Sequence, residues 1–63
     1  MEDLKNLRNF CDEQIKKHPQ LKVDIITCYN LCLDNIEEGE SVVNEIELCL
    51  TNINYMLNMY YLK

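Results

Sequence analysis

Residues 37–62 read EEGESVVNEIELCLTNINYMLNMYYL, an acidic break that leads into a long, largely apolar segment. Gly39 suits the left-handed backbone position just past the end of a helix. Ser41 is a good N-cap for the residues that follow it. The break therefore predicts a tight turn between two antiparallel helices, and the second of these helices runs over residues 42–62.

Two further helices are expected before this turn. Residues 3–17 carry one apolar stripe at spacings of three and four, as an amphipathic helix does. His18 precedes Pro19, and a residue before proline is driven out of the α-helical region, so this helix ends there. Residues 20–38 carry an apolar arc of roughly 160°, wider than the ~100° stripe of an ordinary surface helix. We therefore expect the helix over 20–38 to be covered from two sides.

Nothing in the chain reads as a strand, and the connections are short. We expect an all-α fold, a small antiparallel three-helix bundle with helices over about 3–17, 20–38 and 42–62, in a single domain over residues 1–63. A chain of this size buries only about 60% of the surface that its unfolded form exposes, so a deep catalytic cleft is hard to build. The sequence also has no triad arrangement, phosphate-binding glycine loop or calcium loop. We expect a protein that is not an enzyme and that uses no cofactor.

The helix expected over 42–62 has two apolar stripes. The broad stripe that would meet the other helices consists of Val42, Ile46, Cys49, Leu50, Ile53, Met56, Leu57 and Tyr60. The second stripe lies nearly opposite and consists of Leu48, Tyr55, Met59 and Leu62. One three-helix monomer cannot cover both, so we expect the second stripe to be exposed and to bind another protein. The alternative is ordinary surface, because much of any protein surface is apolar.

Charge is distributed unevenly along the chain. The formal net charge is −5, and residues 23–62 hold seven acidic residues and no basic one. Such a surface repels phosphate, so direct nucleic-acid binding is not expected. Five of the acids surround the expected turn, namely Glu37, Glu38, Glu40, Glu45 and Glu47. They form either a solvated turn or a negative surface that docks on a basic protein.

The N-terminal stretch MEDLKNLRNF is charged, and it does not read as a signal peptide. The uncharged residues 48–62 are fewer than the about 20 apolar residues that a transmembrane helix needs. We therefore expect a soluble cytoplasmic protein without membrane contact. The chain has no Ala, one Gly and one Pro, which indicates an AT-rich genome such as many phages, viruses and low-GC bacteria have. In a viral setting the location is the host cytoplasm.

The four cysteines, Cys11, Cys28, Cys32 and Cys49, each fall on the apolar stripe of their helix. Reduced cysteine behaves as a small buried hydrophobe, so we interpret them as core thiols of an intracellular protein. A thiolate site for zinc or an iron–sulfur cluster is an alternative, because Cys28 and Cys32 lie one helical turn apart and the other two could converge on them. Disulfides are a further alternative, which the lack of a secretory signal weakens. His18 is interpreted as a helix-end residue and not as a catalytic base.

These features predict a small acidic protein–protein interaction module. It would be a regulator or inhibitor that binds a larger host protein with a basic surface and performs no catalysis. Anti-defence proteins of phages fit this description as a class. One alternative is a homodimeric bundle that buries the second stripe about a twofold axis. Another is a small domain that binds a metal through its cysteines.

Overall fold

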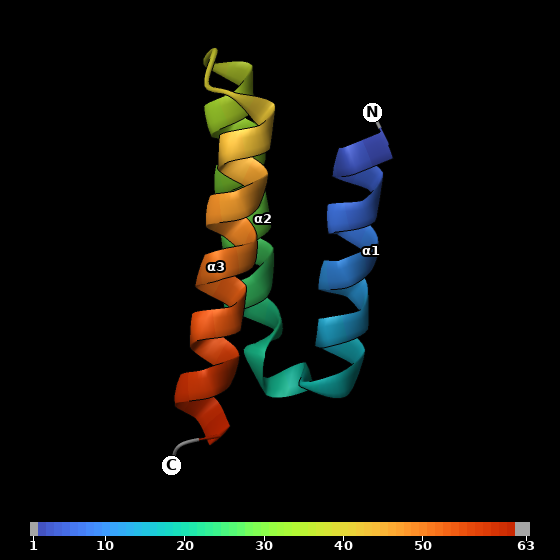
Figure 1. The fold of residues 1–63 in the computed structure, drawn as a ribbon. Helices are drawn as coiled ribbons and strands as arrows, with labels where there is room; N and C mark the ends of the chain where they lie inside the picture. Colours follow the sequence, from blue (N-terminus) through green and yellow to red (C-terminus); the bar gives the residue numbers. More distant parts are fainter. Residues whose placement is uncertain (1, 62–63) are drawn as a thin grey trace.

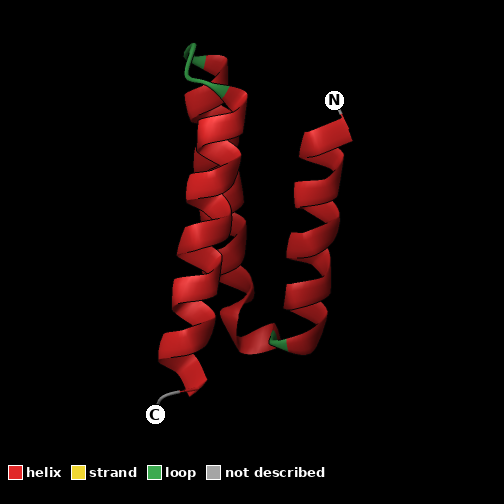
Figure 2. Ribbon diagram, in the orientation of Figure 1, coloured by secondary structure: helices red, strands yellow, loops and turns green. Residues whose placement is uncertain are grey.

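The computed structural model describes the backbone of residues 2–61 and the side chains of residues 3–60. It consists of α1 (Glu2–Lys17), a short 3-10 turn η1 (Pro19–Leu21), α2 (Lys22–Glu37) and α3 (Val42–Tyr61), as Figure 1 shows. Each helix runs antiparallel to the one before it, and the part of the chain that is described contains no strand (Figure 2). The expected all-α three-helix bundle is confirmed.

The α1–α2 junction is built around His18 and Pro19. His18 has φ −135° and ψ 68°, outside the helical region, as its place before proline requires. Its carbonyl accepts a hydrogen bond from the N–H of Leu21 at 2.9 Å, and this bond closes η1. The expectation that the second α-helix begins at Gln20 is therefore corrected to Lys22. Proline has no N–H and takes the first position of a tight i→i+3 turn before the α-helix proper begins.

The C-terminal part of α3 packs against this junction. The rings of Tyr60 and His18 lie 6.3 Å apart, edge to face, with 62° between their planes. The side-chain amide of Gln20 donates a hydrogen bond to the Tyr60 hydroxyl. The uncharged segment is thus helical as far as Tyr61. Its end contacts the α1–α2 junction through Tyr60.

The α2–α3 turn closes as the acidic break predicts. Gly39 has φ 106°, in the left-handed region where an L side chain is strained by about 1–2 kcal/mol. The two hydrogen bonds of a Schellman motif are present, from the N–H of Gly39 to the carbonyl of Ile36 and from the N–H of Glu40 to that of Asn35, both at 3.0 Å. The Oγ of Ser41 accepts a hydrogen bond at 3.4 Å from the N–H three residues further on, so Ser41 is the N-cap of α3.

The core is small and draws equally on the three helices. Its buried side chains are Leu7, Cys11, Ile25, Cys32, Cys49 and Ile53. Ile25 and Ile53 are fully buried. Because half of this core consists of thiols, the interpretation of these three cysteines as core residues is confirmed.

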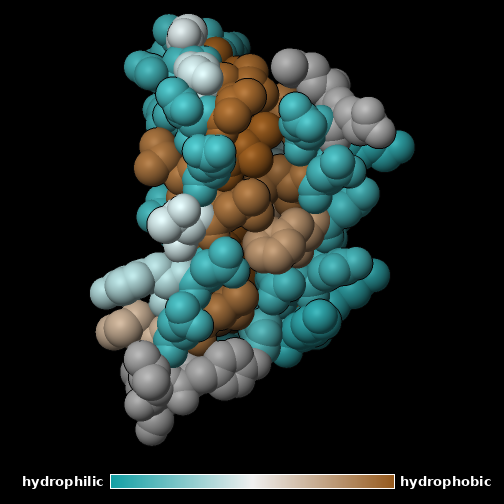
Figure 3. All heavy atoms as spheres, viewed as in Figure 1, coloured by the Kyte–Doolittle hydropathy of each residue, from teal (hydrophilic) through white to brown (hydrophobic). Residues whose placement is uncertain are grey.

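The molecule is elongated, with principal extents of 37 × 17 × 15 Å. α2 and α3 form a long hairpin, and α1 lies along one side of it (Figure 1). An apolar band remains visible between α3 and α1 in the space-filling view (Figure 3). Near the start of α3, Val43 and Ile46 line a hollow of about 330 Å³ on this side, together with residues of α1. Across the described residues, none of the helices combines the length and the apolar character that crossing a membrane requires.

Candidate functional site

The second apolar stripe of α3 lies at the surface. Leu48, Tyr55 and Met59 are 55%, 65% and 49% exposed. The expectation that these side chains are exposed is confirmed, while Leu62 lies outside the residues whose structure is described. From Leu48 to Met59 the stripe extends for about 16 Å along the helix axis, given the rise of a helix per residue.

An apolar residue of α2 joins this stripe. Leu31 is 57% exposed and lines a pocket together with Leu48, so the two leucines stand on either side of the groove between α2 and α3. In the sequence Leu31 falls among polar residues and has no place in a core. An apolar residue on the polar side of a helix could have indicated a contact surface from the sequence alone. We refer to Leu31, Leu48, Tyr55 and Met59 together as the α2–α3 face.

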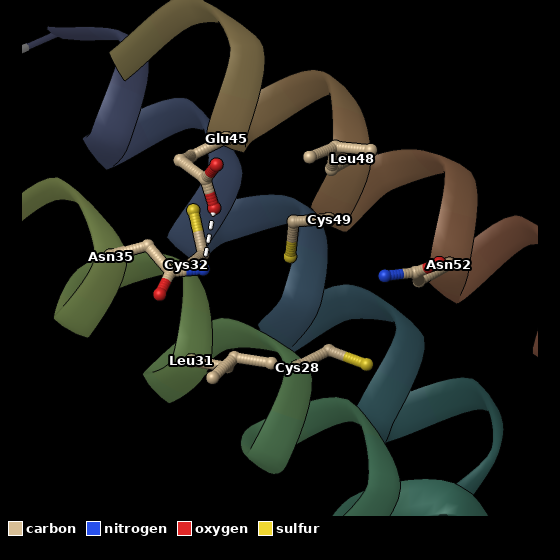
Figure 4. Close-up of a pocket in the computed structure, with 8 residues that line it drawn as sticks. All are labelled: Cys28, Leu31, Cys32, Asn35, Glu45, Leu48, Cys49 and Asn52. Atoms are coloured by element: carbon tan, nitrogen blue, oxygen red, sulfur yellow. Dashed lines mark hydrogen bonds between the residues drawn. The ribbon is translucent and has the colours of Figure 1, made fainter. Parts of the chain in front are cut away.

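The pocket in this face has a volume of about 160 Å³. Its lining comes from both helices of the hairpin: Cys28, Leu31, Cys32 and Asn35 of α2, and Glu45, Leu48, Cys49 and Asn52 of α3. Figure 4 shows these side chains with the ribbon of α1 passing behind them. The pocket therefore opens on the side of the hairpin that α1 does not cover.

Glu45 is not part of an exposed acidic turn, which corrects the expectation that it belongs either to a solvated turn or to a negative docking surface. Its side chain is only 9% exposed, and its Oε1 accepts a hydrogen bond of 2.8 Å from the Nδ2 of Asn35, drawn in Figure 4. Glu45 lies one helical turn before the buried Cys49, which itself lies one turn before Ile53, so it continues the core side of α3. The spacing of four residues between Glu45 and Cys49 could have indicated from the sequence that Glu45 is buried. The first turn of α3 also places the carboxylate at the positive end of the helix dipole, which favours it there.

The remaining acids of the turn are exposed but do not form one patch. Glu37, Glu38 and Glu40 surround the turn itself. Glu47 lies on another side of α3, where it lines the hollow next to Asp3 of α1. The structure thus separates the five acids into an exposed group at the turn, a buried carboxylate in the pocket and an acid near the start of α1.

The cysteines are free and mostly buried. Burial, together with the neighbouring sulfurs of Cys11 and Cys32, raises the pKa of Cys49 to about 12. Burial also raises the pKa of the half-buried Cys28 thiol, which lies in the pocket wall. Thiols with raised pKa values stay protonated at neutral pH and are poor metal ligands and nucleophiles.

A cysteine-ligated metal centre finds no support in this geometry. The alternative interpretation required Cys11, Cys28, Cys32 and Cys49 to converge on one ion. Among the described residues, no three side chains of His, Cys, Asp or Glu are grouped so that they could hold a metal ion. The three buried thiols are packed as hydrophobes, and Cys28 borders the pocket.

The α2–α3 face is therefore the main candidate for a functional site. It combines four exposed apolar side chains with a pocket that contains a buried carboxylate. Comparison of the sequence with models of protein families and with curated proteins, and of the structure with solved structures, finds no match.

Proposed function

We propose that this protein is a small acidic interaction module that regulates or inhibits a larger protein by binding to it, without catalysis. The observation that carries the proposal is the α2–α3 face, whose four apolar side chains are 49–65% exposed on the side of the hairpin away from α1. Water contact with an ordered set of large apolar side chains is unfavourable, and such sets mark contact surfaces. Tyrosine and methionine are also enriched in protein interfaces.

The charge of the chain defines the kind of partner. Residues 23–62 contain no basic residue, and Glu37, Glu38 and Glu40 are exposed at the end of the hairpin. A partner with a basic surface is attracted to this end over the distance of about a Debye length and is oriented before contact. Proteins that handle nucleic acid present such surfaces. We therefore propose a partner in that class, with the module acting as a phage or viral inhibitor, including the anti-defence type.

The size of the molecule is compatible with this role. A standard interface buries about 800 Å² on each partner. The accessible surface here is 4693 Å², so an interface of that size takes roughly a sixth of it. A single face of the hairpin is sufficient, and α1 remains free to stabilise the fold from the other side.

A homodimer through the same face is the second candidate. A twofold contact would bury the apolar stripe of each copy against the other. If the two hairpins run parallel, it would also place their acidic turns close together, with no basic residue between positions 23 and 62 to compensate them. Like charges across an interface are unfavourable. The net charge of −5 on each copy opposes association in any arrangement and favours a different protein as the partner.

Affinity capture with matched variants tests the proposal. Leu48→Asp places a charge in the α2–α3 face, and Asn54→Asp adds the same charge at an exposed position on another side of α3. We expect proteins from the native host to be retained by wild type and by Asn54→Asp and lost with Leu48→Asp. The purified partner should then bind Leu48→Asp at least about tenfold more weakly, as for an interface hot spot. Retention of one and the same set of proteins by all three would contradict the proposal.

A further inference from the structure

The pocket in the α2–α3 face has a specific chemistry that the apolar stripe alone does not have. We propose that it receives one basic side chain of the partner protein, arginine in the first place, with its aliphatic part between Leu31 and Leu48 and its charge on Glu45. This inference rests on the proposed function, since it assigns the chemistry by which the same face recognises its partner.

The size of the pocket sets the size of its occupant. Its volume is about 160 Å³, close to the roughly 150 Å³ of a protein cavity that holds one benzene molecule. A group of this size is a single side chain and not a peptide segment or a cofactor. The pocket is partly open to solvent, so a side chain can enter it from a docked protein.

The lining matches the two parts of a basic side chain. Leu31 and Leu48 supply apolar walls, which suit the methylene groups of arginine or lysine. Glu45 supplies a carboxylate that makes one hydrogen bond, from Asn35. The side chain of Asn52 also lines the site. A planar guanidinium can donate to both oxygens of one carboxylate at once, which favours arginine over lysine.

Burial of Glu45 favours a cation over an apolar occupant. Glu45 as a residue is only 9% exposed, and the hydrogen bond from Asn35 and the dipole of α3 stabilise its carboxylate there. An apolar side chain in the pocket would remove the remaining water from the carboxylate without replacing its hydrogen bonds, which is unfavourable for a charged group. A cation would replace that water with an ion pair, and such a pair is stronger in a partly buried site than at the surface.

A second copy of the chain is a poor source of this cation. The basic residues of the chain are Lys5, Arg8, Lys16, Lys17, Lys22 and Lys63. All but the last lie on α1 or at the start of α2, away from the pocket. The bases of α1 lie on the other side of the hairpin from the pocket, so a copy that inserted one of these would make a head-to-tail contact, which leaves an unfilled pocket at one end and an unpaired base at the other. A partner with its own basic surface fills the pocket in a closed one-to-one complex.

A pair of capped tripeptides provides a defined probe. Gly-Arg-Gly carries the basic side chain, and Gly-citrulline-Gly replaces it with a neutral group of nearly the same shape. We expect the arginine peptide to give saturable NMR shifts at Leu31, Leu48 and the side-chain amide of Asn52, with a dissociation constant on the order of 1–10 mM, as for a small ligand with few contacts. The citrulline peptide should bind at least about fivefold more weakly because it lacks the charge.

Two matched variants separate the pocket from general attraction to an acidic protein. Glu45→Gln keeps an oxygen for Asn35 and should weaken the arginine peptide at least about fivefold. Glu40→Gln removes the same charge from the exposed turn and should change its affinity less than about twofold. Three results would overturn the assignment: equal affinity for the two peptides, an equal loss of affinity for the arginine peptide in the two variants, or no saturable shift at the pocket up to about 20 mM peptide.

The outcome can be distinguished from failure of the proposed function. If Leu48→Asp loses the partner protein while Glu45→Gln binds it as wild type does, the interaction module stands and the assignment of a basic side chain is wrong. If neither substitution affects capture of host proteins, the α2–α3 face has no role in binding and both proposals are wrong.

Discussion

Cys49 is the residue whose environment differs most from that of a free amino acid. Its side chain is almost fully buried beside Cys11 and Cys32, and burial raises its pKa to about 12 from an ordinary value of 9.0. In the unfolded chain the thiol ionises near its ordinary value. The folded protein therefore holds more protons than the unfolded chain between pH 9 and pH 12, and the free energy of unfolding must fall as pH rises through that window.

This difference predicts an alkaline loss of stability that depends on the thiol. Urea unfolding of the wild type should give a lower free energy of unfolding at pH 10.5 than at pH 7.5. Cys49→Ala removes the titrating group, so its stability should depend less steeply on pH, although the variant is less stable at pH 7.5 because a buried side chain is shortened. An identical pH dependence of the two proteins would show that Cys49 ionises as readily in the folded state as in the unfolded chain.

Truncation of a side chain should have a large effect on stability on the buried stripe of α3 and a small effect on the exposed stripe. Ile53 is fully buried and Tyr55 is 65% exposed. Ile53→Ala should lower the free energy of unfolding by about 2–5 kcal/mol. For a domain of this length the total is about 3–9 kcal/mol, so this variant will be largely unstable. The milder Ile53→Val should cost about 0.5–1.5 kcal/mol and remain measurable.

Tyr55→Ala is the matched truncation on the exposed stripe. It should change the free energy of unfolding by no more than about 0.5 kcal/mol, because surface substitutions away from specific contacts rarely do more. Chemical denaturation followed by circular dichroism measures both variants. If Tyr55→Ala were as destabilising as Ile53→Val, the stripe would contribute to the fold of the monomer and would not be free to bind a partner.

The helices of this protein could be predicted from sequence because their ends are determined locally. His18 before Pro19 ends α1, and Gly39 with Ser41 fixes the turn between α2 and α3. The 3-10 turn of η1 could not be separated from a helix start, because both have similar local patterns. Periodicity also assigned the exposed stripe of α3 correctly, since the side of a helix follows from residue spacing alone.

The pocket could not be predicted because it depends on how α2 and α3 are rotated against each other. Periodicity places Leu31 and Leu48 on the outside of their own helices but does not say that the two positions meet across a groove. The same limit applies to Glu45. Its spacing from Cys49 placed it at the edge of the core side, but proximity to the acidic turn led to the wrong interpretation. The hydrogen bond from Asn35 of α2 could not be inferred from this spacing, because it depends on the position of the neighbouring helix.

At the scale of the whole molecule, apolar attraction and charge act in opposite directions. The α2–α3 face favours association, while a net charge of −5 on 63 residues opposes the approach of a second identical chain. The same charge assists the approach of a basic partner. Salt screens both the repulsion and the attraction. Added salt should therefore strengthen association between identical chains and weaken binding of a basic partner.

Sedimentation velocity of the purified protein tests this balance. At low ionic strength, where repulsion is strongest, we expect a monomer for wild type and for Leu48→Asp alike. Any self-association should increase as salt is added, because screening weakens repulsion between copies while apolar contacts persist. Binding of the basic partner should weaken over the same range. A dimer already present at low salt, which dissociates in Leu48→Asp but persists in Asn54→Asp, would instead show that the partner of the α2–α3 face is a second copy of the chain.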